Sequence, residues 1–139
     1  MIWFFKKMYY RILPPNHHPF RTGKKINFVF IHINKTAGTS ISKNLGFYSK
    51  RHYKVNEVQE LTGTDWHNAF TFTVVRNPYD RAVSQFEYAR LNNDCNIRTQ
   101  NISFDEWIKL TYKEKRPFFR KAGQKFFSTQ KEWLLNKNG

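Results

Sequence analysis

The stretch Phe28-Val-Phe-Ile-His-Ile-Asn-Lys-Thr-Ala-Gly-Thr-Ser40 decides the fold of this chain. Residues 26–33 are almost continuously apolar and rich in β-branched and aromatic side chains, which is typical of a buried strand in a parallel sheet. A loop over 34–39 and a helix from Ser40 to about Tyr48 are expected to follow. At such a junction, backbone amides and the positive end of a helix can bind phosphate. The stretch therefore predicts an anion-binding site.

A second stretch, Phe70-Thr-Phe-Thr-Val-Val-Arg-Asn-Pro-Tyr-Asp-Arg-Ala-Val-Ser84, repeats this order of elements. Residues 70–75 predict a strand, and Asn77-Pro78 predicts a helix start because Asn caps a helix and Pro fits its first position. The residues expected to face the core are Tyr79, Ala82, Val83, Phe86 and Ala89 or Arg90. Two such sites in one small domain suggest a ligand with phosphates at both ends.

The remaining patterns complete an α/β fold with a parallel sheet. A short helical stripe over 55–61 ends at Gly63, and Ser103 with Glu106 forms a capping box that opens a further helix. Residues 113–125 are basic and poorly periodic. The alternation of strand, loop and helix indicates one α/β domain.

The chain is strongly basic, with a net charge of +14 over 139 residues. The first 56 residues hold eleven Lys or Arg and no Asp or Glu. Such a charge attracts polyanions, including nucleic acid, anionic lipid and sulfated or phosphorylated ligands. A Lys-rich composition alone is an equal explanation of the total charge, but it does not explain the two ordered motifs.

The start of the chain predicts neither a membrane span nor a signal peptide. Segment 1–13 is aromatic and basic, and charged residues interrupt its apolar runs. We expect it to pack on the domain, with peripheral membrane contact as the alternative. Residues 14–19 predict an extended linker, so a basic aromatic segment with its linker (1–25) precedes a domain over 26–139.

Cys95 is the only cysteine, so the chain can form no internal disulfide and no cysteine-based metal site. This composition is compatible with a reducing, cytoplasmic compartment. No base partner is evident beside Cys95, and we expect a bystander thiol.

The segment Lys35-Thr-Ala-Gly-Thr-Ser40 has the parts of a phosphate cradle: a turn of small residues, a lysine and two hydroxyl groups. It is not a Walker A loop, because its lysine precedes the turn. The second predicted strand is followed by Arg76, with no convincing acidic partner for Mg²⁺. Metal-assisted ATP chemistry is therefore disfavoured, and we expect no metal.

Arg76 is expected at the carboxyl end of its strand, where ligands bind in open α/β sheets. Asn77, Arg81 and Ser84 follow at i, i+4 and i+7, so they share one helix face. A guanidinium with a hydroxyl can clamp a second phosphate. For Arg81, an ion pair with Asp80 or another acid is the favoured role, whereas for Arg76 phosphate binding is favoured.

These motifs resemble those of the PAPS-dependent sulfotransferases, particularly the carbohydrate, heparan sulfate 2-O-like branch. The stretch 32–40 looks like the 5′-phosphosulfate loop of that family, and 75–84 looks like its 3′-phosphate motif. The resemblance extends over 26–139. It implies a P-loop-NTPase-like three-layer fold, PAPS as co-substrate without metal, and a hydroxyl acceptor, for which we expect a carbohydrate.

The resemblance also implies a role for each matched residue. Lys35 would contact the bridging oxygen and the sulfuryl group and stabilise the leaving phosphate. The 5′-phosphate would be held by the amides of Thr36, Ala37, Gly38 and Thr39 and by the hydroxyls of Thr39 and Ser40. Arg76 and Ser84 would bind the 3′-phosphate. His52 lies where such enzymes place a histidine that deprotonates the acceptor, with an ordinary surface histidine as the alternative.

The chain departs from the family pattern at two loop positions and at its end. Ala37 stands where relatives often have glycine, so a left-handed backbone there would be strained. Asn34 stands where relatives often have proline. Segment 130–139 resembles the segment that precedes a further strand in the family, and that strand is not part of this sequence. We therefore expect a domain that is incomplete at its C-terminal end.

Two other classes of function stay open on these residues. One is a nucleotide-dependent phosphotransferase of the wider P-loop type. The other is a non-catalytic basic module that binds nucleic acid or an anionic membrane. The two ordered motifs favour the sulfotransferase, so nucleic acid is the less favoured partner.

Overall fold

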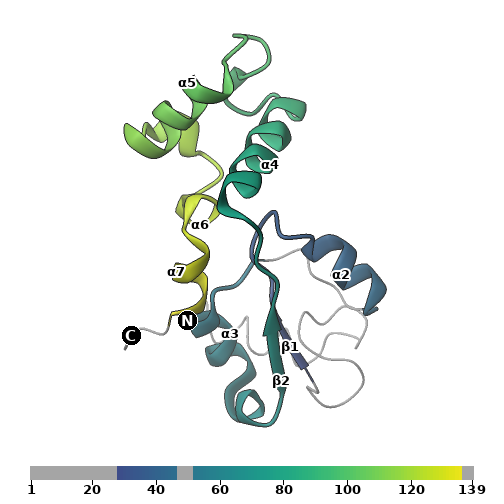
Figure 1. Ribbon diagram of the computed structural model, residues 1–139. Coiled ribbons are helices and arrows are strands. Elements are labelled where there is room, and N and C mark those ends of the chain that lie inside the picture. The colour runs from purple at the N-terminus through teal and green to yellow at the C-terminus, as the bar shows by residue number, and fades with distance from the viewer. Residues whose placement is uncertain (1–27, 47–51, 136–139) are drawn as a thin grey trace. The chain divides into compact units, whose positions relative to one another are not determined.

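The computed structural model describes residues 28–46 and 52–135 of the chain. The described residues form two compact units, whose elements are labelled in Figure 1. The first unit combines the chain up to Val75 with 130–135, and the second is Arg76–Thr129. The predictions for segment 1–25 lie outside the described residues and stay predictions.

A parallel pair of strands forms the centre of the first unit. These are β1 (Phe28–Ile31) and β2 (Phe70–Thr73), paired in register from Phe28 with Phe70 to Ile31 with Thr73. Strand β1 is buried from its second residue onward, as its apolar run predicts, whereas Phe70 of β2 is exposed. The predicted α/β organisation with a parallel sheet is confirmed. Within the described residues the sheet has these two strands.

Both strands are shorter than the apolar runs predict. Strand β1 ends at Ile31 because the chain turns there, and the amide of Ile33 donates to the carbonyl oxygen of Ile31 at 3.1 Å. Strand β2 ends at Thr73, two residues before the predicted end. Parallel strands need a crossover connection, and the described part of this one carries two α-helices and a 3-10 helix.

The described residues of the first unit form the helical elements α2 (Gly38–Asn44), α3 (Val55–Thr62), the 3-10 helix η2 (Gly63–His67) and α7 (Gln130–Leu134). Helix α2 begins two residues before the predicted start at Ser40, because the carbonyl oxygen of Ala37 already accepts the first helical bond from Ile41. Helix α3 ends at Gly63 as predicted, where φ is 62°.

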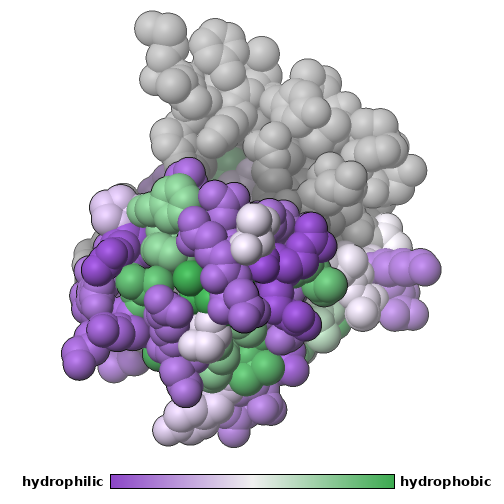
Figure 2. Space-filling view, turned by 90° about the horizontal axis from the view of Figure 1, so that it is seen from above, coloured by the Kyte–Doolittle hydropathy of each residue, from purple (hydrophilic) through white to green (hydrophobic). Residues whose placement is uncertain are grey.

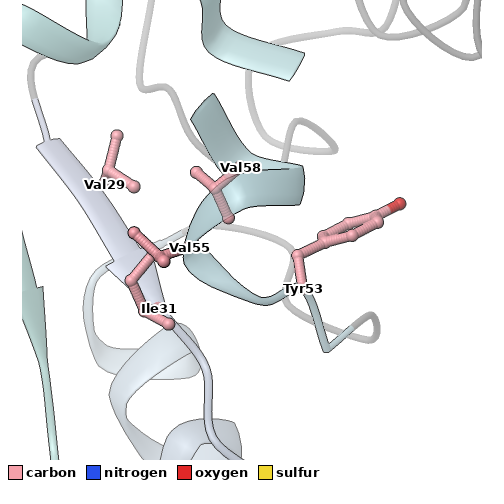
Figure 3. Packing of buried hydrophobic residues seen from close by; sticks show 5 residues of the cluster. All are labelled: Val29, Ile31, Tyr53, Val55 and Val58. Carbon is pink, nitrogen blue, oxygen red and sulfur yellow. The ribbon is translucent and has the colours of Figure 1, made fainter. Parts of the chain in front are cut away.

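Helix α3 covers one face of β1. Val29 and Ile31 of the strand face Val55 and Val58 of the helix, and Tyr53 completes the cluster (Figure 3). Burial of each such side chain contributes about 1.5–3 kcal/mol. This packing fixes the carboxyl end of β1, from which the first predicted motif leaves.

The second unit is helical. Its elements are α4 (Pro78–Leu91), the 3-10 helix η3 (Asp94–Asn96), α5 (Phe104–Ile108), the π-helix η4 (Lys109–Lys113), the 3-10 helix η5 (Pro117–Arg120) and α6 (Gln124–Phe127). Asn77 caps α4 by accepting from the amide of Tyr79, and Ser103 caps α5 by accepting from the amide of Glu106. Both predicted helix starts are confirmed.

The buried face of α4 agrees with the prediction at Phe86 and Ala89 and differs from it at Tyr79 and Val83. Tyr79 and Val83, expected in the core, are 81% and 46% exposed. The buried residues of the helix are Arg81, Gln85, Phe86 and Ala89. The side chains of Arg81 and Gln85 are buried because they donate hydrogen bonds to carbonyl oxygens at the end of the second unit. The spacing of apolar residues alone does not predict that two polar side chains are buried.

An aromatic core holds the second unit together. It consists of Phe86, Ala89, Ile97, Trp107 and Phe127.

Large hydrophobic side chains also stay exposed, including Phe70 of the first unit and Leu91 of α4. On the face shown in Figure 2, hydrophobic residues lie in small groups between hydrophilic ones.

Candidate functional site

The carboxyl ends of β1 and β2 form the edge from which the candidate site is built. Because the strands are parallel and Ile31 pairs with Thr73, both end at the same side of the sheet. The hydroxyl of Thr73 donates to the carbonyl oxygen of Ile31 at 2.8 Å and joins these ends. Ligands bind at this edge in open α/β sheets. The first motif starts here, and the chain leaves β2 here toward Arg76.

Internal hydrogen bonds hold the loop after β1 in a tight turn. Thr36 is buried, and its hydroxyl donates to the carbonyl oxygen of Ile33 at 2.8 Å. On either side of it, Lys35 and Ala37 both have φ of 64°. Position 37 thus has the left-handed backbone that glycine adopts without strain, and alanine there costs about 1–2 kcal/mol.

The first turn of α2 presents hydroxyl groups and no negative charge. Thr39 and Ser40 are exposed, and the turn contains no acidic residue. The hydroxyl of Ser42 donates to the carbonyl oxygen of Gly38 at 2.5 Å and stabilises the start of the helix. Unpaired amides at a helix start favour an anion. The structure thus brings Lys35, Thr39 and Ser40 to one turn, as the sequence predicts.

Gly38 is required because the ring of His32 lies against it. A Cβ atom at position 38 would lie 1.9 Å from Cδ2 and Nε2 of His32. The His32 ring is buried and stacks on Phe30, with ring centroids 5.5 Å apart. This packing agrees with the structural role expected for His32, and it supports the loop at Gly38.

His52 lies beside His32 in the first unit. Its Nδ1 is 3.0 Å from the carbonyl oxygen of His32, and the two ring centroids are 4.2 Å apart. The ring of Trp133 in α7 meets His52 edge-on, with centroids 6.2 Å apart. His52 is nevertheless exposed. The imidazole of His52 is therefore held in place and reachable from solvent. The contact of Trp133 with His52 was not predicted, and no signal in the sequence pointed to it.

The second motif places its side chains in different environments. Arg76 is exposed and Ser84 is half-buried on α4. Asn77 uses its side-chain oxygen as the helix cap. Arg81 is buried, and its guanidinium donates to the carbonyl oxygens of Ser128 at 2.9 Å and Phe126 at 3.4 Å.

These contacts with backbone carbonyls agree with a structural role for Arg81, and the expected ion pair with an acid stays a prediction. The side-chain amide of Gln85 donates to the carbonyl oxygen of Phe126 at 2.6 Å, and the hydroxyl of Tyr112 donates to Gln85 Oε1. Burial lowers the pKa of Arg81 and raises the pKa of Tyr112, while the charge of Arg81 acts on Tyr112 in the opposite direction. Sequence reasoning missed Gln85 and Tyr112. The i, i+4 spacing of Arg81 and Gln85 was the available signal.

A cavity of about 300 Å³ lies inside the second unit. It is lined by aromatic side chains that include Trp107 and Phe119, with Cys95 and Lys121 also at its wall. The Cys95 thiol donates to the carbonyl oxygen of Phe118 at 2.8 Å. Burial raises the pKa of Cys95, and Lys121 opposes this only in part. A protonated thiol agrees with the predicted bystander role.

Within the part of the chain that the structure describes, no group of three or more His, Cys, Asp or Glu side chains gathers as a metal-binding cluster would. None of the helices described there combines the length and the apolar character that crossing a membrane requires.

The chain has a parallel strand pair, a tight turn after one strand and a capped helix after the other. A sequence model described as the sulfotransferase family matches residues 18–134. The chain belongs to this family. Searches of curated proteins and of solved structures gave no match.

Proposed function

We propose that this chain transfers a sulfuryl group from PAPS to a hydroxyl group of a carbohydrate. Membership of the sulfotransferase family supports the transfer, and PAPS is the donor which that membership suggests. The observation that carries the proposal is the parallel pairing of β1 with β2, because both phosphate motifs then start from one edge of the sheet.

The loop from Lys35 to Ser40 binds the 5′ end of the donor in this proposal. The amides of 36–39 and the hydroxyls of Thr39 and Ser40 hold the 5′-phosphate, and Lys35 stabilises the charge that develops on the leaving phosphate. Two observations support this role. The hydrogen bond of Thr36 with the carbonyl oxygen of Ile33 holds the turn, and the first turn of α2 has no carboxylate.

Arg76 and Ser84 bind the 3′-phosphate in this proposal. A guanidinium and a hydroxyl form charge-assisted hydrogen bonds with phosphate. Arg76 is exposed and follows Thr73, the last residue of β2, by three residues.

His52 acts as the general base. It takes the proton of the acceptor hydroxyl while a new oxygen–sulfur bond forms and the sulfur–oxygen bond to the leaving phosphate breaks. Such a transfer depends on in-line placement of the two oxygens and requires no covalent bond to the protein. The ring contacts of His52 with His32 and Trp133 support this role, because a base must be held in one orientation.

An anionic saccharide suits the charge of the chain. Residues 109–125 contain seven Lys or Arg and a single acid, Glu114. Glu114 already pairs with Lys109 and Arg116, at 3.6 and 2.6 Å. The excess positive charge would raise the local concentration of a polyanionic acceptor. Transfer of labelled sulfate to an anionic polysaccharide, compared with a small phenol, tests the acceptor class.

Calorimetry with PAP, the nucleotide that PAPS becomes when its sulfuryl group is transferred, tests donor binding. We expect PAP to bind without added Mg²⁺ and more tightly than ATP or a short oligonucleotide, which represent the two alternative functions. Arg76→Ala should weaken PAP binding about tenfold or more, because a charge-assisted hydrogen bond is lost. The same change should alter the affinity for adenosine 5′-phosphosulfate, which lacks the 3′-phosphate, by no more than about twofold.

Arg98→Ala is the matched control, since Arg98 is an exposed arginine of the same unit outside both motifs. It should change neither affinity. Equal losses for both ligands in Arg76→Ala would refute the 3′-phosphate assignment. Failure of PAP to bind the parent chain would refute the proposed function.

A further inference from the structure

His52 is held by the residue that follows β1. Strand β1 ends at Ile31, and the carbonyl oxygen of the next residue, His32, is 3.0 Å from Nδ1 of His52. The His32 ring contacts the His52 ring from one side, and the ring of Trp133 approaches it edge-on. All these residues belong to the first unit. The imidazole of His52 therefore has a defined orientation.

The partner of Nδ1 determines where the proton lies. A carbonyl oxygen only accepts hydrogen bonds, so Nδ1 must carry the hydrogen in this contact. A neutral imidazole has one N–H group, so its lone pair is then on Nε2. A histidine side chain without such a partner favours the opposite tautomer in water. The backbone of His32 thus selects the less common form of His52.

His32 also supports the donor loop. Its ring lies so close to Gly38 that the glycine cannot gain a side chain, and it stacks on Phe30 of β1. Loss of this ring would leave a gap under the first turn of α2 and free the chain that carries the carbonyl oxygen. One residue therefore contacts both the turn assigned to the donor and the histidine assigned to the acceptor.

We propose that His32 is a positioning residue: its carbonyl oxygen holds His52 as the Nδ1–H tautomer, so that Nε2 is the nitrogen that takes the proton of the acceptor. This inference rests on the proposed function for the role of His52 as base. The position of the hydrogen on His52 in the resting chain does not depend on that role.

Nitrogen-15 NMR of the full 139-residue chain tests the tautomer directly, because protonated and unprotonated ring nitrogens have widely different chemical shifts. His52→Gln identifies the His52 signals. We expect Nδ1–H for His52 at mildly alkaline pH. His67, an exposed histidine at the end of η2, is the internal control and should show Nε2–H. A predominant Nε2–H form of His52 overturns the inference.

Substitution of His32 tests the positioning role. His32→Ala should mix the tautomers of His52 and lower kcat about tenfold at saturating donor, in addition to any loss of PAP affinity that the gap under α2 causes. His32→Phe keeps a ring of similar shape against Gly38, and it should recover the Nδ1–H form and most of the lost kcat. Unchanged tautomer and kcat in His32→Ala overturn the inference. If the alanine variant does not fold, the spectrum of the parent chain and the phenylalanine variant still decide it.

PAP titration of the same samples separates the two proposals. PAP binding with the Nε2–H form of His52 refutes the positioning of His52 and leaves the donor site standing. The Nδ1–H form without PAP binding refutes the proposed function and leaves the orientation of His52 standing.

Discussion

Ala37 is a residue whose side chain opposes the backbone that the loop needs. Its φ of 64° lies in the left-handed region, directly before α2. Ala37→Gly should raise the free energy of unfolding by about 1 kcal/mol, because relief of the steric strain exceeds the added entropy of the unfolded chain. Urea unfolding of the two chains measures this difference.

The control for this change is Ala82→Gly, inside α4. There glycine should destabilise by about 1 kcal/mol, since it lowers helix propensity and relieves no strain. A destabilising Ala37→Gly would show that the loop in solution does not have the left-handed backbone at this position.

Thr111 carries a buried hydroxyl with no hydrogen-bond partner within the described residues. Thr111→Val keeps the shape of the side chain and removes the polar atom, so it should stabilise the chain by about 1 kcal/mol. Thr62→Val is the matched control, because the Thr62 hydroxyl is also buried but donates to the carbonyl oxygen of Val58 at 2.9 Å. The control should lose stability, and a loss in both variants would mean that Thr111 has a partner in solution. Thermal unfolding of both variants gives the comparison.

At the scale of elements, the sequence predicted the helix starts that depend on contacts between neighbouring residues. The cap at Asn77 and the cap at Ser103 involve partners two and three residues away, and both helix starts are where the sequence predicts them. On α4 the predicted burial of Phe86 and Ala89 is confirmed, and that of Tyr79 and Val83 is wrong. The buried face differs there because Arg81 binds carbonyl oxygens 45 and 47 residues further along the chain. No periodicity can show such partners.

The candidate site divides in the same way. The residues of the loop from Lys35 to Ser40 and the strand before them could be named from sequence, because strand, turn and helix start follow one another directly. The contact of His52 with the carbonyl oxygen of His32 joins residues 20 positions apart and involves a backbone atom. It therefore leaves no pattern in the side chains.

The packing of α4 against the end of the second unit predicts a loss of stability at alkaline pH. Burial raises the pKa of Tyr112 above its ordinary value of 10.0, and Arg81, Arg120 and the hydrogen bond with Gln85 oppose this only in part. Above pH 10.0 the unfolded chain releases a proton that the folded chain retains. The free energy of unfolding therefore falls as pH rises from that value.

Tyr112→Phe removes this titration, so the difference in stability between the variant and the parent chain should shift in favour of the variant as pH rises above 10.0. Cys95 has a raised pKa as well, but it is present in both chains and cancels in the difference. Urea unfolding at several pH values measures the trend. A difference that stays constant with pH would contradict the burial of the Tyr112 hydroxyl.

At the scale of the whole molecule, the two motifs that we propose to bind phosphate belong to different compact units. The loop of Lys35 is in the first unit, and Arg76 and Ser84 are in the second. Family membership covers both, since the matched residues run from 18 to 134. A donor that binds both motifs would therefore link the stability of the units, because a ligand stabilises every part of a protein that must be folded to bind it.

Hydrogen exchange of the full chain with and without PAP measures this link. At a PAP concentration of about 100 times Kd, the stabilisation available is about 2.7 kcal/mol, which slows exchange of amides that open only by unfolding of the binding region about 100-fold. We expect slower exchange both in β1 and α2 and in α4. Adenosine 5′-phosphosulfate should slow exchange mainly in β1 and α2, because it lacks the phosphate assigned to Arg76 and Ser84. Protection of a single unit by PAP would mean that one motif binds the nucleotide without the other, and the assignment of two phosphate sites to one ligand would fail.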